Sequence, residues 1–282
     1  AGSGLLTHPR DGIAAVGRTA RRLTTAVAEE VLPAAPPSEL NGRIGSRRTL
    51  VGYHAPRELL STARGGGGTL NDVGLTAVAG ALRTLAQRRG ETPTEPLKTM
   101  IPVSMRRIGD DEAGNQIAMV HTPLPVHLAT CKGRLDWVRE QTERLKHTDR
   151  PAATQTFVDA LGLVPPLLRT PVARAMATPR QFNLTVSQSP APRGDMYLLG
   201  ARLEDVYSVV PIAQGHSLAI GMVRYRQELF FGCHADPDAL PEVHELPALL
   251  EAELEELAAA APKRDRPARE GRSGRAPLSP VG

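Results

Sequence analysis

Residues 69–85 read TLNDVGLTAVAGALRTL, and this stretch predicts the buried helix around which the rest of the domain is organised. Thr69, Asn71 and Asp72 are residue types that begin helices, because their side-chain oxygens accept hydrogen bonds from the free N–H groups of a first turn. Apolar residues then recur at helical spacing: Val73, Leu75, Ala77, Val78, Ala81, Leu82 and Leu85. The stretch therefore predicts a buried helix that ends before Gly90.

The middle of this helix consists of small residues. Ala79, Gly80 and Ala81 follow one another there, so another element can approach the helix closely. Four glycines at 65–68 precede the helix and predict a hinge.

Strand-like stretches elsewhere occur in runs between helices, which is the pattern of an α+β domain. We expect strands within 46–56, 97–103, 116–124, 182–187, 196–203, 208–212, 218–225 and 229–233. Helices are expected at 57–63, 134–147 and 247–260. Residues 182–187 alternate between apolar and polar, which predicts a strand with one buried face.

The two ends of the chain differ in composition from its middle. Residues 1–39 combine an amphipathic helix at 9–32 with a Pro-rich linker, and 152–176 form a helical stretch broken by prolines. Residues 263–282 are rich in Pro, Arg, Gly and Ser, so they predict a disordered basic tail. The globular domain is thus expected at 40–262.

Charge and composition exclude several classes of protein. Of 282 residues 41% are hydrophobic and only 3% aromatic, so the stacking platforms of a single-strand nucleic-acid binder are scarce. The net charge of +4 equals that of residues 263–282, which hold six basic and two acidic residues, so the body is neutral. Two cysteines without a CxxC pair, no visible signal peptide and no apolar run of about 20 residues predict a cytoplasmic location. The first residue is Ala rather than Met, which suggests a fragment or a processed product.

Several short motifs follow one another in the order and spacing of a known family. They are LNDVGLTAVAGALRTL at 70–85, PVSMRR at 102–107, GNQ at 114–116, TVSQSPAP at 185–192 and FFGCHADPDALP at 230–241. From about Leu40 to Leu257 the chain resembles the C-terminal half of the bacterial wax ester synthase/diacylglycerol acyltransferase (WS/DGAT) family. The resemblance implies one half of a chloramphenicol-acetyltransferase-like fold, a mixed sheet flanked by helices.

The resemblance also implies an activity. The family transfers an acyl group from acyl-CoA to diacylglycerol or a long-chain alcohol, which yields triacylglycerol or wax esters without a bound cofactor. Its general base is a histidine of an HHxxxDG motif in the N-terminal half, and none of the eight histidines here is adjacent to another. The expected partners are therefore acyl-CoA, a lipid alcohol and an HHxxxDG half in cis or in trans, with possible contact to the inner membrane face or lipid droplets.

By resemblance, this chain supplies one wall of the acyl-transfer cleft. Asn71 and Asp72 support catalysis, and the expected substrate contacts are Ser104, Arg106, Asn115, Ser187 and Pro190. The usual NVPGP of the family reads QSPAP at 188–192 here. Each position also has a structural interpretation: Asn71 and Asp72 as helix caps, Arg106 as a solvated loop residue rather than a phosphate ligand, Asn115 in a turn and Ser187 at a strand edge.

Two other classes remain open from the residues. GHSLA at 215–219 resembles the GxSxG elbow of serine hydrolases, but an elbow requires a helix after the serine. The residues after Ser217 instead alternate into a hairpin, so Ser217 is expected to begin a strand. His234, Asp236 and Asp238 predict a turn rather than a metal site. The other class is a half-domain that binds a partner without catalysis.

Overall fold

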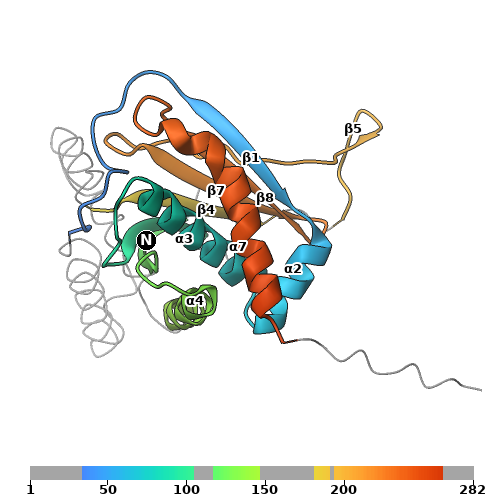
Figure 1. Ribbon diagram of the computed structural model, residues 1–282. Helices are drawn as coiled ribbons and strands as arrows, with labels where there is room; N and C mark the ends of the chain where they lie inside the picture. The colour runs from blue at the N-terminus through green and yellow to red at the C-terminus, as the bar shows by residue number, and fades with distance from the viewer. Residues whose placement is uncertain (1–33, 105–116, 147–180, 191–193, 263–282) are drawn as a thin grey trace, which may run out of the picture.

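The computed structural model describes residues 34–104, 117–146, 181–190 and 194–262. The predictions for 9–32, 152–176 and 263–282 lie outside these ranges. The described residues form one mixed sheet with helices packed on one of its faces (Figure 1). The strands are β1 (Thr49–Ala55), β2 (Leu97–Ser104), β3 (Ile117–Leu124), β4 (Leu184–Pro190), β5 (Tyr197–Leu198), β6 (Ala201–Arg202), β7 (Leu218–Tyr225) and β8 (Glu228–Ala235). The α-helices are α2 (Arg57–Ala63), α3 (Leu70–Arg88), α4 (Cys131–Lys146) and α7 (Leu246–Ala260), and short 3₁₀ turns lie at Arg64–Gly66 and Pro241–Glu245.

The large sheet has six strands in the order β1-β8-β7-β4-β2-β3. Strand β4 is parallel to both β2 and β7, and the remaining neighbours are antiparallel. The predicted hairpin around Arg226 and Gln227 is confirmed, and both residues have positive φ, as a tight two-residue turn requires. The α+β class and the mixed sheet flanked by helices are confirmed.

The prediction of a half-buried strand at 182–187 is wrong. Asn183, directly before β4, and Thr185 within it are buried together with the apolar residues of the strand, which lies inside the sheet. Asn183 donates to the Pro36 carbonyl (2.8 Å) and accepts from the Lys98 backbone N–H (2.8 Å). Asn183 therefore holds the segment at 36–41 against the sheet instead of facing water.

Helix α3 is buried along nearly its whole length and forms the centre of the helical layer. Its small residues bring α7 close: a Cβ on Gly80 would overlap the carboxyl group of Glu253. That carboxyl group accepts two hydrogen bonds from Nη2 of Arg134 on α4 (2.8 and 2.6 Å). Nη1 of Arg134 donates to the backbone carbonyl groups of Leu128 (2.9 Å) and Ala129 (3.0 Å). A buried ion pair thus joins α4 to α7 and packs against α3 at the position where the sequence predicted a close approach.

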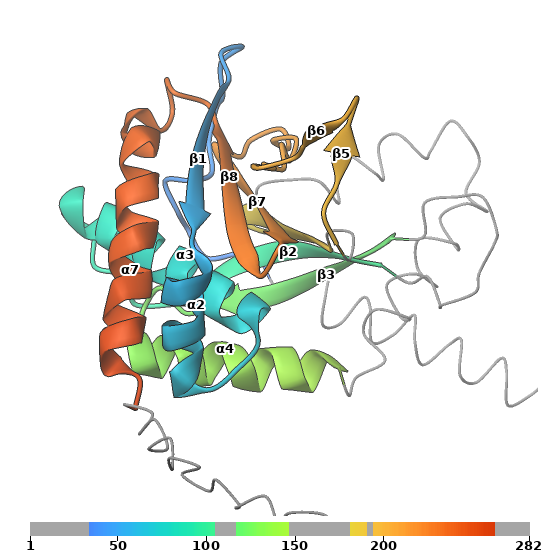
Figure 2. The same ribbon diagram turned by 90° about the vertical axis from the view of Figure 1, so that its right-hand side faces the viewer.

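The prediction of a strand at 208–212 is also wrong. Residues 203–212, here called the strap, pair with no described strand and cross the face of the sheet that lies away from α7 (Figure 2). Gly52, Gly232 and Gly221 are aligned across β1, β8 and β7. A Cβ on any of them would overlap the strap at Tyr207 or Ser208. Because these three positions lack side chains, the strap can lie directly on the face of the sheet without being one of its strands.

Candidate functional site

The start of α3 is organised by a reciprocal cap. The Thr69 hydroxyl accepts from the Asp72 backbone N–H (3.3 Å), and Asp72 Oδ2 accepts from the Thr69 N–H (2.7 Å) and hydroxyl (2.8 Å). Thr142 on α4 donates to the other carboxyl oxygen of Asp72 (2.7 Å). Asp72 is only 4% exposed, so its carboxylate is fully engaged within the protein. This geometry matches a capping box with Asp in place of Glu.

Asn71 differs from its neighbour. It is the second residue of α3 and takes no part in the cap. Its side chain is half-buried, and among the residues that the structure describes none hydrogen-bonds its amide. The expectation that Asn71 caps the helix is therefore wrong, whereas that for Thr69 and Asp72 is confirmed. The Asn71 amide remains available for a ligand or for a segment outside the described ranges.

Two other predicted residues lie at the same end of the sheet as Asn71. Ser104 ends β2 and Pro190 ends β4, which runs parallel to β2, whereas Ser187 is the middle residue of β4. The first turns of α3 lie at this end too, since a Cβ on Gly74 would meet Met222 and Leu229, near the carboxyl end of β7 and the start of β8.

The remaining two predicted site residues, Arg106 and Asn115, lie outside the described residues. An open hollow of about 470 Å³ borders the α3 start, between Thr69, Asp72 and the exposed residues of α4. Its lining contains Asp72, Asp136, Glu140 and Glu143 against Arg139 alone. The residues that line this hollow therefore offer little positive charge to the phosphates of CoA.

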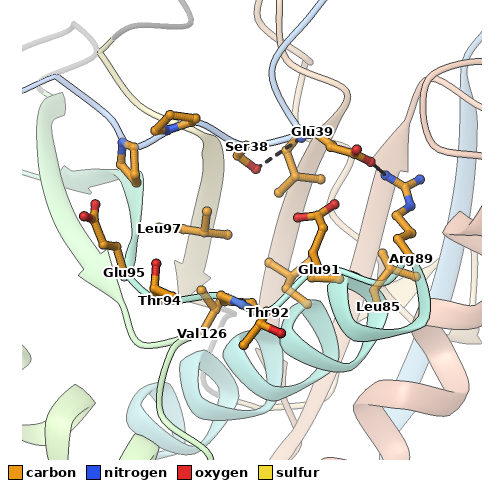
Figure 3. Close-up of a pocket in the computed structure, with 16 residues that line it drawn as sticks. Ser38, Glu39, Leu85, Arg89, Glu91, Thr92, Thr94, Glu95, Leu97 and Val126 are labelled. Carbon is orange, nitrogen blue, oxygen red and sulfur yellow. Dashed lines mark hydrogen bonds and ion pairs between the residues drawn. The ribbon is translucent and has the colours of Figure 1, made fainter.

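A second cavity, of about 330 Å³, lies at the other end of α3 (Figure 3). Leu85, Leu97 and Val126 line its apolar part, while Glu39, Glu91, Glu95 and Arg89 supply its charged groups. Burial and the neighbouring Glu39 raise the pKa of Glu91. None of the predicted site residues lines this cavity, which lies roughly 20 Å along the helix axis from Asn71 at 1.5 Å per residue.

Ser217 lies in a structural rather than a nucleophilic environment. It is 2% exposed, its hydroxyl donates to the Leu40 carbonyl (3.1 Å), and β7 begins at the next residue. The imidazole of His216 stacks on Phe182 with ring centroids 4.0 Å apart, and its Nε2 lies 3.0 Å from the Phe182 carbonyl oxygen. A serine followed directly by a strand does not form a nucleophile elbow.

Other nucleophile and metal chemistries lack support in the described ranges. Burial raises the pKa of Cys131 to about 11 and that of Cys233 to about 12, so both thiols stay protonated near neutral pH. Asp236 accepts hydrogen bonds from the backbone N–H groups of Gly45 (2.5 Å) and Asp238 (2.9 Å), as the predicted turn requires. Within the described ranges no group of three His, Cys, Asp or Glu side chains is placed to hold a metal ion. The helices of the same ranges are too short or too polar to cross a membrane.

The fold and the family follow from comparison with known proteins. The chain superimposes on a wax ester synthase/diacylglycerol acyltransferase of Marinobacter aquaeolei VT8 with a TM-score of 0.62 at 22% identity, over 88% of this chain and 57% of that one. It matches the first condensation domain of the CDA synthetase with a TM-score of 0.55 at 15% identity, over 89% and 53%. These likenesses define a half of the chloramphenicol-acetyltransferase-like class.

Sequence comparison gives the family. Residues 113–258, just over half of the chain, match the model of the WS/DGAT C-terminal domain, and the chain belongs to this family. A putative diacylglycerol O-acyltransferase of Mycobacterium tuberculosis is 31% identical over 79% of this chain and 50% of its own length. The O-acyltransferase WSD of Acinetobacter baylyi is 30% identical over 78% and 48%. The chain thus spans about half the length of the curated relatives that it matches.

Sequence reasoning missed one residue near the candidate site. Thr142 completes the hydrogen bonds of Asp72 from a position 70 residues later in the chain. No local pattern marks it, because the partner of its hydroxyl is set by the packing of α4 on α3. The Thr69–Asp72 spacing, in contrast, is a local signal of a reciprocal cap.

Proposed function

We propose that this chain is the C-terminal half of an acyl-CoA-dependent O-acyltransferase that esterifies diacylglycerol or a long-chain alcohol. The observation that carries the proposal is the match of residues 113–258 to the WS/DGAT C-terminal domain. The names of the relatives support the same reaction class, since they are diacylglycerol O-acyltransferases and wax ester synthases. Triacylglycerol or wax ester is the proposed product.

The reaction requires groups from two halves. A histidine of an HHxxxDG half acts as general base on the acceptor hydroxyl, and the alkoxide attacks the thioester carbonyl of acyl-CoA. The C–S bond breaks when the tetrahedral intermediate collapses, and CoA leaves. This chain contributes polar groups from the end of the sheet where Asn71, Ser104 and Pro190 lie, and Ser187, Arg106 and Asn115 are assigned to the same wall. No cofactor is proposed, since acyl-CoA is itself a substrate.

Within that wall, Asn71 has the most direct role. Its amide has no described partner, whereas the Asp72 carboxylate beside it is engaged by Thr69 and Thr142. An amide N–H held at a helix start is a suitable donor for an oxyanion. Asp72 then acts as the positioning residue that fixes the turn carrying Asn71.

The test is esterification by this chain mixed with an HHxxxDG half. Asn71→Asp removes the N–H donor with little change in shape, and a carboxylate suits the first turn of a helix. We expect the variant to fold as well as wild type and to lose about 100-fold or more in turnover, the usual effect of removing an oxyanion donor. Glu58→Gln, an exchange between carboxylate and amide in the exposed first turn of α2, is the matched control and should keep full turnover.

Several outcomes separate this proposal from its alternatives. Full turnover by Asn71→Asp would remove the residue from the site. Robust esterification by the chain alone would refute the need for a second half, while binding of that half without turnover would favour a non-catalytic partner. Labelling of Ser217 by a fluorophosphonate would favour a serine hydrolase. Contact with the inner membrane face or lipid droplets is proposed as a consequence of the lipid substrates.

A further inference from the structure

The hairpin formed by β5 and β6 exposes a row of large apolar side chains. Tyr197 is 64% exposed, Leu198 75% and Leu199 100%. The hairpin projects from the body of the protein, on the side of the sheet away from α7 (Figures 1 and 2). Three adjacent residues of this type place much exposed apolar area at one projecting tip, and exposed apolar area of this kind commonly marks an interaction site.

The turn itself is disfavoured in the isolated chain. Leu199 and Gly200 connect the paired residues Leu198 and Ala201, and both have positive φ (50° and 84°). A turn of this kind favours Asn-Gly or Asp-Gly, and leucine is a poor choice for the left-handed region. A leucine at position 199 is therefore unfavourable for two reasons, its backbone conformation and the full exposure of its apolar side chain. A contact between this side chain and another molecule would account for the choice of leucine.

The base of the hairpin, in contrast, is firmly held. The Tyr225 hydroxyl accepts from the Met196 backbone N–H (3.0 Å) and donates to the Leu203 carbonyl (3.1 Å). Tyr225 is 1% exposed, and Met196 and Leu203 pack against the small core cluster that contains it. The tip is thus presented on a fixed support, which lowers the entropy cost of binding.

The chemistry of the hairpin favours a protein partner over lipid. Strands β5 and β6 have two residues each and pair only with each other among the described strands, so their outer edges offer free N–H and C=O groups. Such groups cannot enter hydrocarbon without a large cost, whereas they can pair with a strand of another polypeptide. The charges near the base neutralise one another, because Arg226 pairs with Asp195 (3.2 Å) and Arg202 with Glu204 (2.8 Å). Among the described residues, these pairs carry no net positive charge that would attract an anionic membrane.

Size argues against a second copy of this chain. Three side chains of at most about 200 Å² each supply at most about 600 Å² per copy, below the roughly 800 Å² per partner of a standard interface. A tip of this size fits as one part of a larger contact. The relatives supply a partner of the required extent, since this chain accounts for only 48–57% of the Acinetobacter and Marinobacter proteins.

We infer that the β5–β6 hairpin is a docking element for the HHxxxDG-bearing half, in cis or in trans, with Leu198 and Leu199 as its apolar anchors. The inference rests on the proposed function for the identity of the partner. It adds the surface by which the two halves recognise each other.

The experiment measures binding of the full 282-residue chain to a purified probe, the N-terminal half of the Acinetobacter relative, by titration calorimetry. Leu198→Ser combined with Leu199→Asn removes both anchors, and Asn suits the positive φ of the turn. We expect the dissociation constant to rise at least tenfold, while the melting temperature of the chain alone stays the same or rises. The matched control is Leu50→Thr in β1, where the leucine is 43% exposed and lies at the start of a different strand.

Each result decides the inference. Unchanged affinity in the double variant, no binding by the wild-type chain, or an equal loss in Leu50→Thr would overturn it. Hairpin-dependent binding to phosphatidylcholine vesicles with undiminished binding of the probe half would also overturn it, in favour of a lipid contact. Turnover measured in the same mixtures reports on the proposed function separately: hairpin-dependent binding without esterification leaves the docking element standing and rejects the activity.

Discussion

Replacing Gly80 with alanine should destabilise the protein, although the same change stabilises most helices. Gly80 lies inside α3, and a Cβ there would overlap the carboxyl group of Glu253. The carboxyl group cannot yield easily, because Nη2 of Arg134 donates to both of its oxygens. The methyl group must therefore displace Glu253 from its ion pair or push α7 away from α3.

The two opposing terms have different sizes. Alanine gains about 1 kcal/mol over glycine from helix propensity. Removing one partner of a buried ion pair costs about 3–5 kcal/mol, which bounds the cost of displacing Glu253 from Arg134, whose side chain is only 2% exposed. The net loss is then at most about 2–4 kcal/mol. For a domain of this size that corresponds to a fall in melting temperature of roughly 5–15 °C.

Urea denaturation followed by circular dichroism at 222 nm, with calorimetry for the melting temperature, measures the effect. Gly74→Ala in the same helix is the matched control, since its Cβ would meet only the flexible ends of Met222 and Leu229. Overpacking costs about 1–3 kcal/mol and helix propensity returns about 1 kcal/mol, so we expect the control to lose clearly less stability than Gly80→Ala. A Gly80→Ala protein as stable as wild type would refute the claim that the ion pair fixes the spacing of α3 and α7.

Two further predictions concern buried polar groups. Burial lowers the pKa of His216 below 6.5, although both ring nitrogens lie near carbonyl oxygens, so the unfolded chain binds a proton more readily than the folded one. The unfolding free energy should therefore fall as the pH drops below about 6.5, and this fall should be smaller in His216→Gln. Chemical denaturation at a series of pH values tests both expectations. Thr142→Val leaves one oxygen of the Asp72 carboxylate without its donor and should lower the unfolding free energy by about 1–3 kcal/mol. Thr142→Ser keeps the hydroxyl and should retain most of the stability. Equal unfolding free energies for the two variants would contradict a role for the hydroxyl.

Local patterns predicted those parts of the fold that depend on local contacts. The helix at 70–88, its Thr69–Asp72 cap and the tight turn at Arg226 were recoverable, because their determinants lie within four residues of one another. The small residues around Gly80 predicted a close approach but not its partner. Only the folded chain places Glu253, which lies 173 positions later, against that glycine.

Sequence patterns gave wrong predictions where long-range packing, rather than residue type, decides burial and strand pairing. The polar positions at 182–187 predict a solvent-facing side, yet Asn183 is fully buried because the segment at 36–41 supplies hydrogen-bond partners for it. Residues 208–212 have strand-like composition but pair with no described strand. At the candidate site, the residue types at the start of α3 favoured capping by both Asn71 and Asp72. Only the hydrogen bonds of the folded chain show that Asp72 belongs to the cap and that the Asn71 amide has no described partner.

The row of Gly52, Gly232 and Gly221 has a consequence for how this protein can evolve or be redesigned. Each glycine leaves room for the strap where a side chain would ordinarily stand: Gly221 and Gly232 lie under Ser208, and Gly52 lies under the Tyr207 ring. Any larger residue at one of these three positions would meet Tyr207 or Ser208 and lift the strap away from the sheet. The glycine row therefore acts as a fixed boundary, and sequence variation in this domain has to be accommodated elsewhere.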